Sequence, residues 1–305
     1  MIIFLIILAV LLVLLLLGGY LIDRWAIFTN RVPLEKTREQ EQKNGSLDGF
    51  LDLPTEPFLL TSFDGYALHA FYIPAKAESN RFVILSHGYT YSRYGAVKYL
   101  KLFREYGFHC IIYDDRGHGE NKPYKCTFGL LESRDLMALI DYTYKRFGND
   151  ISLGLHGESM GSGLQIMALQ YHPKLDFIVN DCGYAVLTDV LTEKMQTDLH
   201  LAPFLLPWLS LCARIFYGFS YYDVRPIDSL SDNHVPICFI HGADDKFIDK
   251  NHSERMYRAT QGYKELHLFD GADHALSCLT DPVRYKKVLF SFLDRIYENS
   301  QPAIS

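Results

Sequence analysis

The chain has 305 residues, of which 49% are hydrophobic and 22% are charged, and its formal net charge is −6 at pH 7. These values describe a folded protein with a large core and exclude an intrinsically disordered chain. The acidic balance gives no electrostatic basis for nucleic-acid binding. The six cysteines show no Cys-x-x-Cys spacing, so the sequence predicts neither a disulfide framework nor a zinc site.

Residues 2–22 contain no charged side chain and are dominated by Leu and Ile. About 20 such residues are needed for a helix to cross the hydrocarbon core of a bilayer. No Lys or Arg precedes this run and no small-x-small cleavage site follows it, so we predict an uncleaved anchor over residues 1–23, with a signal peptide as the alternative. The positive-inside tendency favours a cytoplasmic domain, because five basic residues follow the run: Arg24, Arg31, Lys36, Arg38 and Lys43.

The next segment, residues 24–55, is polar and is predicted to be a linker or stalk, with a short helix over part of its length. Two apolar runs, 58–61 and 67–73, flank an Asp-Gly turn and predict an antiparallel hairpin. This hairpin opens a domain that we place at residues 56–299.

Within this domain, near-continuous apolar runs alternate with helical periodicity. Such runs are typical of parallel strands buried on both faces, and the expected strands are 82–86, 108–113, 151–156, 177–180, 236–241 and 265–269. Apolar spacings of three and four residues predict helices around 136–147 and 288–296. The pattern predicts an α/β fold, a mostly parallel sheet with helices on both faces. Residues 183–230 interrupt it and are too long for a structureless loop, so we predict a small helical insertion there.

The most informative motif is the pentapeptide Gly-Glu-Ser-Met-Gly at residues 157–161, directly after a predicted strand. It predicts a sharp turn from strand to helix, in which Ser159 has positive φ and the small residues on either side let the two backbones pass closely. The turn lifts the serine hydroxyl clear of the sheet, and the first amides of the next helix point toward negative charge that forms beside it. Ser159 is therefore the candidate nucleophile.

With this motif in place, the chain resembles an α/β-hydrolase from about Phe58 to its C-terminal end. In that fold the catalytic residues follow the order serine, acid, histidine. The resemblance implies Asp245 as the acid, in a His-Gly-x-x-Asp pattern that ends a buried strand, and His274 as the base after the last strand. The adjacent Asp244 and the strand-end Asp181 stay open as alternative acids.

The same resemblance implies an oxyanion hole formed by the backbone N–H groups of Tyr89 and Met160. Met160 follows the nucleophile, and Tyr89 lies in the loop after an early strand. A single Gly precedes Tyr89, so efficient hydrolysis of tertiary-alcohol esters is not expected. The segment 113–119 also resembles a segment typical of this family. We interpret Asp115 and Arg116 as residues that bond this loop to neighbouring elements, rather than as residues that shape the bottom of the pocket.

Together these residues predict a serine hydrolase, of the esterase or lipase type, that cleaves a carboxylic ester through an acyl-enzyme. A serine peptidase of the aminopeptidase type is the alternative, for which a carboxylate such as Glu158 would hold an amine terminus; a thioesterase and a non-catalytic binding module also stay open. The apolar insertion and the anchor favour a lipophilic ester as substrate. No cofactor or metal is predicted, and the sequence leaves acyl-chain length and oligomeric state open.

Overall fold

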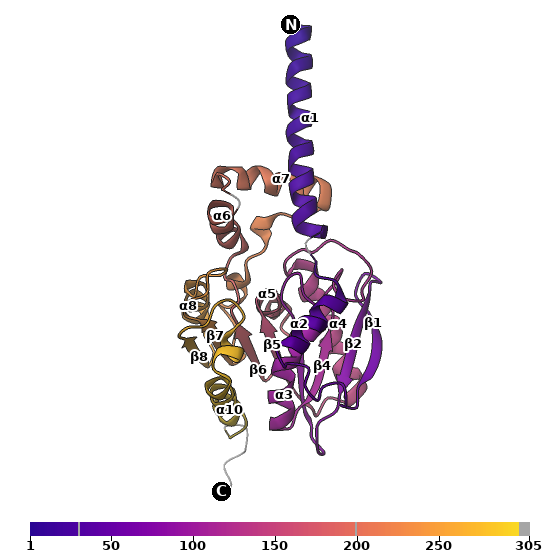
Figure 1. Ribbon diagram of the computed structural model, residues 1–305, viewed down its shortest axis with the longest axis vertical. Coiled ribbons are helices and arrows are strands. Elements are labelled where there is room, and N and C mark those ends of the chain that lie inside the picture. Colours follow the sequence, from indigo (N-terminus) through magenta and orange to yellow (C-terminus); the bar gives the residue numbers. More distant parts are fainter. Residues whose placement is uncertain (30, 199, 299–305) are drawn as a thin grey trace.

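The computed structural model describes residues 1–29, 31–198 and 200–298, and the described chain contains one eight-stranded sheet (Figure 1). The strands are β1 Glu56–Thr61, β2 Ala67–Ile73, β3 Arg81–Ser86, β4 His109–Tyr113, β5 Ser152–Glu158, β6 Phe177–Asp181, β7 Ile237–Gly242 and β8 Lys264–Phe269. Their order in the sheet is β1-β2-β4-β3-β5-β6-β7-β8. β2 pairs antiparallel with β1 and β4, and all the other neighbours pair in parallel. The predicted hairpin and mostly parallel sheet are confirmed.

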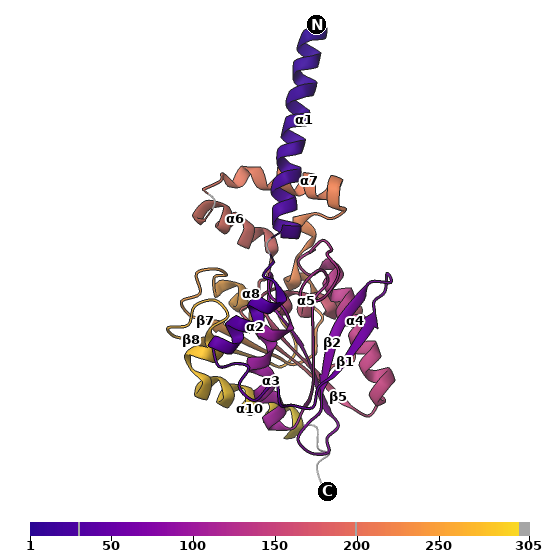
Figure 2. The same ribbon diagram turned by 45° about the vertical axis from the view of Figure 1, so that its right-hand side comes forward.

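Helices cover both faces of this sheet, as the alternating pattern predicts (Figure 2). α3 and α10 pack on one face, whereas α4, α5 and α8 pack on the other. Their bounds are α3 Val97–Tyr106, α4 Leu130–Phe147, α5 Met160–Ala168, α8 Asn251–Ala259, α9 Ser277–Thr280 and α10 Pro282–Glu298. The fold therefore has three layers, and the carboxyl ends of its parallel strands lie at one edge of the sheet.

The N-terminal part of the chain is a long apolar helix, α1 Ile2–Arg24, continued by a π-helical turn at Trp25–Thr29. Among the described residues, one helical stretch, Ile2–Phe28, is long and apolar enough to cross a membrane. A membrane anchor and a signal sequence share these properties. In Figures 1 and 2, α1 projects from the domain and ends close to the insertion between β6 and β7.

The segment that we predicted to be a linker is packed against the domain instead of standing clear of it. It contains the expected short helix, α2 Leu34–Lys43, and the side chains of Leu47 and Phe50 belong to the same core cluster as α3. Thr37 Oγ1 also lies 2.6 Å from Ser92 Oγ. These few buried residues belong to a segment whose composition is mostly polar, so the sequence gives no sign that the segment packs against the domain. Asn30 lies outside the described residues.

We call residues 183–230 the lid insertion. It is helical, as expected, with α6 Leu187–Thr197 and α7 Leu206–Tyr217. A short 3₁₀ turn at Pro203–Leu205 lies between these helices, and two more, at Tyr221–Asp223 and Pro226–Ser229, follow α7. Residue 199 of this insertion and residue 299 of the predicted domain lie outside the described residues. The apolar side chains of the insertion form a third core cluster, which also contains Ile27 from the N-terminal segment and Met160 from α5.

Candidate active site

Ser159 occupies the turn between β5 and α5. Its backbone has φ 55° and ψ −114°, so the predicted positive φ is confirmed. A Cβ added to Gly157 would lie 2.5 Å from the carbonyl carbon of Gly161, which explains why glycine is needed where strand and helix pass. A strained non-glycine residue persists only where its surroundings hold it, and such residues cluster at functional sites.

The structure brings Ser159, Asp245 and His274 together from three separate elements. Asp245 follows β7 and His274 follows β8, so both lie beside Ser159 at the carboxyl edge of the sheet. The Ser159 Oγ atom is 2.9 Å from His274 Nε2, and His274 Nδ1 is 2.8 Å from Asp245 Oδ2. A proton on Nδ1 would donate to the carboxylate and leave Nε2 to accept the serine proton.

The carboxylate of Asp245 is held by several donors. Its Oδ1 accepts hydrogen bonds from the backbone N–H groups of Phe247 at 2.8 Å and Ile248 at 2.9 Å. Its Oδ2 lies 3.1 Å from His241 Nε2 in addition to its contact with His274. Burial alone would raise the pKa of Asp245, but the hydrogen bonds with His241 and His274 hold this pKa well below its usual value. Asp245 is therefore a carboxylate at every pH at which the protein would work.

Neither alternative acid contacts the histidine. The Oδ2 atom of Asp244 accepts a hydrogen bond from the Gly271 backbone N–H at 2.9 Å. The Oδ2 atom of Asp181, fully buried at the end of β6, accepts from the Tyr285 hydroxyl at 2.9 Å. Of the three candidate carboxylates, the one that the structure places against His274 is Asp245.

Two backbone segments border the serine where an oxyanion hole would form. Met160 is the first residue of α5, and the N–H groups of a first helical turn have no partner within their own helix. The loop after β3 lies close by, because a Cβ added to Gly88 would be 3.5 Å from Ser159 Cβ. Tyr89 follows in that loop, and its side chain lines the same pocket as Ser159 and Met160.

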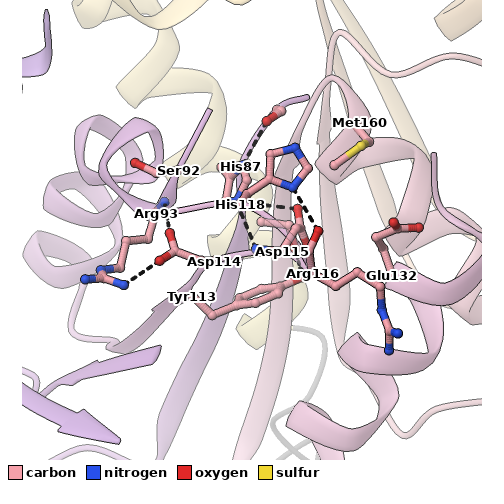
Figure 3. Close-up of polar contacts among 12 residues, drawn as sticks. His87, Ser92, Arg93, Tyr113, Asp114, Asp115, Arg116, His118, Glu132 and Met160 are labelled. Carbon is pink, nitrogen blue, oxygen red and sulfur yellow. Dashed lines mark hydrogen bonds and ion pairs between the residues drawn. The ribbon is translucent and has the colours of Figure 1, made fainter. Parts of the chain in front are cut away.

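The loop after β4 is tied to its neighbours by buried polar contacts, in keeping with our interpretation of it (Figure 3). Arg116 forms ion pairs with Asp135 at 2.6 Å and Asp64 at 2.8 Å. The Asp115 backbone N–H donates to His87 Nε2 at 2.9 Å, which links this loop to the one that carries Gly88. None of these residues lines the pocket that contains Ser159.

A pocket of about 680 Å³ adjoins Ser159 and Met160. Such a volume is within the usual range for sites that bind small molecules. Most of its wall is apolar and comes from the lid insertion and nearby loops, with Phe128, Tyr184, Leu187, Leu206, Leu209 and Ile248 among the lining residues. Another part of the wall comes from the last turn of α1 and from the π-helical turn that follows it, and the sequence gives no reason to place either there.

A second unexpected group is the side chain of Lys98, which reaches the site from α3. Its Nζ atom lies 2.5 Å from Glu158 Oε2, beside the serine, and donates to the Ala275 carbonyl at 3.2 Å, beside the histidine. Glu158 also accepts a hydrogen bond from the Tyr99 hydroxyl at 2.5 Å. No local motif marks Lys98, because its partners are distant in the sequence.

The same region contains one set of potential metal ligands. Single ligand atoms of Cys182, Asp245 and His274 lie within 4.8 Å of one another. However, the Asp245 and His274 atoms already contact each other at 2.8 Å. Burial also raises the pKa of the Cys182 thiol well above its usual value, so the thiolate that a metal would need is disfavoured. The donor set fits an acid–histidine pair better than a metal centre.

Comparison with known proteins agrees with this architecture. Residues 77–211 match the family described as serine aminopeptidase S33, and residues 212–289 match the dienelactone hydrolase family. Among curated proteins, the uncharacterized protein YqkD of Bacillus subtilis strain 168 is 25% identical over 288 residues, covering 93% of this chain and 94% of YqkD.

Solved structures of the same fold include two esterases. The Pyrococcus furiosus esterase Pf2001 aligns with a TM-score of 0.67 at 21% identity, over 81% of this chain and 92% of the esterase. The esterase EaEST from Exiguobacterium antarcticum aligns with a TM-score of 0.58 at 17% identity, over 78% of this chain and 100% of the esterase. At these identities the likeness shows the fold.

The sheet order, the strand-to-helix turn and the two family matches define the class of protein. The chain belongs to the α/β-hydrolase superfamily and is a hydrolase of the α/β type.

Proposed function

We propose that the protein is a serine hydrolase that cleaves a lipophilic carboxylic ester through an acyl-enzyme. The observation that carries the proposal is the continuous contact from Ser159 Oγ to His274 Nε2 at 2.9 Å and from His274 Nδ1 to Asp245 Oδ2 at 2.8 Å. A serine hydroxyl is a weak nucleophile at neutral pH, and a hydrogen-bonded imidazole removes its proton as attack proceeds.

In the first half of the reaction, Ser159 Oγ bonds to the ester carbonyl carbon while its proton passes to His274 Nε2. The Tyr89 and Met160 N–H groups donate to the oxyanion, and Asp245 stabilises the imidazolium. The carbon–alkoxy bond then breaks, and His274 returns the proton to the departing alcohol. In the second half, water gives a proton to His274, attacks the acyl carbon and displaces Ser159, which recovers its proton.

The surroundings of Glu158 favour an ester over a peptide substrate. A peptidase that binds the amino terminus of its substrate needs a carboxylate that no other cation neutralises. Glu158 is the carboxylate next to the proposed nucleophile. Its charge is already neutralised by Lys98 at 2.5 Å, and the Tyr99 hydroxyl donates to the same oxygen at 2.5 Å. The apolar pocket that adjoins Ser159 also suits an acyl chain better than a charged terminus.

We also propose that α1 remains attached as a membrane anchor, with the hydrolase domain in the cytoplasm. Support for retention comes from its packing against the lid insertion, where the Tyr217 hydroxyl donates to the Tyr20 carbonyl at 3.2 Å. The two rings stack with centroids 5.9 Å apart. Support for the orientation comes from the five basic residues that follow the apolar run.

Labelling with an alkyl fluorophosphonate tests the nucleophile. The wild-type protein should become labelled and Ser159→Ala should not, whereas Ser152→Ala, at the opposite end of β5, should label normally. Labelling that persists in Ser159→Ala would overturn the assignment.

Rates with p-nitrophenyl esters, acyl thioesters and aminoacyl p-nitroanilides then distinguish an esterase from a thioesterase and a peptidase. Asp245→Asn should lower kcat by about 10⁴-fold, because it favours the wrong histidine tautomer.

A further inference from the structure

The end of the apolar helix takes part in the pocket that adjoins Ser159. We call residues 20–28 the α1 foot. Five of them line the pocket together with Ser159 and Met160, namely Leu21, Ile22, Asp23, Trp25 and Ala26. A helix that served only as a tether would have no reason to contribute side chains to this wall.

Hydrogen bonds fasten the α1 foot to the loops around the site. The Tyr89 hydroxyl, from the proposed oxyanion loop, donates to the Ala26 carbonyl. The Cys126 backbone N–H donates to the Ile27 carbonyl at 3.1 Å, and the Ile27 side chain is fully buried. The foot is therefore part of the folded domain and touches a loop that the proposed chemistry uses.

The same foot begins where the apolar run of α1 ends. The apolar run ends at Ile22, and the exposed cation of Arg24 follows two residues later. Exposed charges mark the limit of a hydrocarbon span, so Leu21 and Ile22 lie at that limit. Their side chains are 55% and 37% exposed, although both also line the pocket. With α1 in the bilayer, as proposed above, this part of the pocket wall would face the lipid.

The lid insertion adds an apolar surface beside the foot. α7 crosses α1 near its lower end in both views (Figures 1 and 2), and the rings of Tyr20 and Phe216 meet edge to face at 5.3 Å. The side chains of Leu211 and Ile215 on α7 are 53% and 55% exposed. An exposed apolar face on a helix that lies across a membrane-spanning helix is typical of insertion into the membrane interface.

From these contacts we infer that the α1 foot is one wall of an acyl-binding pocket, and that a long-chain acyl ester of the bilayer enters it from the membrane, between α1 and the lid insertion. The inference rests on the proposed function and specifies its substrate class. The bilayer is the partner of the apolar surface on α7. A cleavage within the α1 foot would remove this wall, so the helix must stay attached to the domain.

Photo-crosslinking of the full chain in phosphatidylcholine vesicles tests the inference directly. The probe is a long-chain alkyl fluorophosphonate with a diazirine near the far end of its chain, which would be fixed to Ser159 and then irradiated. Mass spectrometry should locate the crosslink within residues 20–28. Crosslinks confined to other parts of the pocket would overturn the inference, whereas absence of Ser159-dependent labelling would overturn the proposed function and the inference with it.

A pair of variants gives an independent test. Leu21→Trp puts a large ring into the proposed wall, and Leu12→Trp makes the same change in α1 outside the pocket lining. The ratio of kcat/KM for p-nitrophenyl palmitate over p-nitrophenyl butyrate should fall at least about tenfold in Leu21→Trp, a change within the range expected for altered fit in an apolar pocket. It should stay at the wild-type value in Leu12→Trp. An unchanged ratio in Leu21→Trp would contradict the inference.

Discussion

Lys98 Nζ lies 2.5 Å from Glu158 Oε2, and this pair joins α3 to the residue that precedes the proposed nucleophile. The same Nζ donates to the Ala275 carbonyl, next to the proposed base, at 3.2 Å. Burial alone would lower the pKa of Lys98, but the Glu158 carboxylate raises it above its usual value, so the side chain stays charged. One buried cation thus connects the chain segments that carry Ser159 and His274.

We therefore expect Lys98 to be a positioning residue. Lys98→Met should lower kcat by about 10- to 100-fold with a smaller effect on KM, because displacement of reacting groups by about 1 Å has costs of this size. The measurement is steady-state kinetics on a p-nitrophenyl ester. Lys101→Met, one turn away on α3 with its Nζ bonded to the Gly45 carbonyl, is the matched control.

The Lys98 variant also leaves Glu158 as a buried carboxylate without its cation, which is destabilising by about 3–5 kcal/mol. Lys98→Met/Glu158→Gln removes both charges and should recover most of the lost stability. If the connection matters for catalysis, this double variant should keep the low kcat. Recovery of kcat together with stability would show that Lys98 acts through the fold alone.

Asp181 should make stability depend on pH. Its burial, and then the nearby Glu158 charge, raise the pKa of Asp181 from 3.8 to about 6. Because the pKa is raised in the folded state, the protonated Asp181 side chain makes its full contribution to stability below about pH 4. This contribution is lost as the pH rises through about 6. Two pKa units correspond to about 3 kcal/mol, so the ionised side chain should weaken the fold at pH 8 by roughly this amount.

Thermal unfolding of the detergent-solubilised protein checks this effect. Asp181→Asn should have a higher Tm than the wild type at pH 8, and the difference should shrink toward pH 4. Asp150→Asn, at an exposed position before β5, is the control and should follow the wild-type curve. Parallel pH curves for the wild type and Asp181→Asn would contradict the assignment.

Local sequence patterns were enough to predict the frame of the molecule. Strands β3 to β8 coincide with the predicted strands within one or two residues at each end. For β3 to β7 the reason is that strands buried on both faces need continuous apolar side chains. The turn at Ser159 was predictable as well, since it needs glycines at fixed positions around the serine. The choice between Asp244 and Asp245 was open, because it depends on side-chain direction after β7.

Contacts between distant segments were not predictable. Lys98 and Ala275 are 177 residues apart, and nothing near Lys98 marks it as different from Lys101, the other lysine of α3. The α1 foot was invisible for a related reason. Leu21 and Ile22 satisfy the hydropathy expected of a membrane helix, so the sequence gives no further signal that they also line a pocket.

The crossing of α1 and α7 should depend on Gly19. A Cβ added there would overlap Cys212 Sγ and lie 3.0 Å from Cys212 Cβ, whereas a Cβ on Gly18 would lie 3.9 Å from the Trp208 ring. Small residues allow helices to approach closely in membranes. Gly19→Ala should destabilise the crossing by about 1–3 kcal/mol, as overpacking generally does, and Gly18→Ala should be tolerated.

The Tm values of Gly18→Ala and Gly19→Ala in detergent test this prediction, because the two variants carry the same substitution at neighbouring positions. Adding Cys212→Ala to Gly19→Ala removes the Sγ atom and should restore part of the lost Tm. Equal Tm values for Gly18→Ala and Gly19→Ala would mean that α1 does not pack against α7 in this way.

Membrane sidedness can be measured with an introduced cysteine, because the native thiols give little background. All six native cysteines are free and buried, and burial raises the pKa of Cys278 to about 12. The reactive thiolate is therefore scarce at neutral pH. Lys145→Cys places an exposed thiol on α4, away from the residues of the site. A charged maleimide should label it only after cells are permeabilised if the domain is cytoplasmic. The wild type should stay unlabelled in both conditions, and labelling of Lys145→Cys in intact cells would place the domain on the outer side.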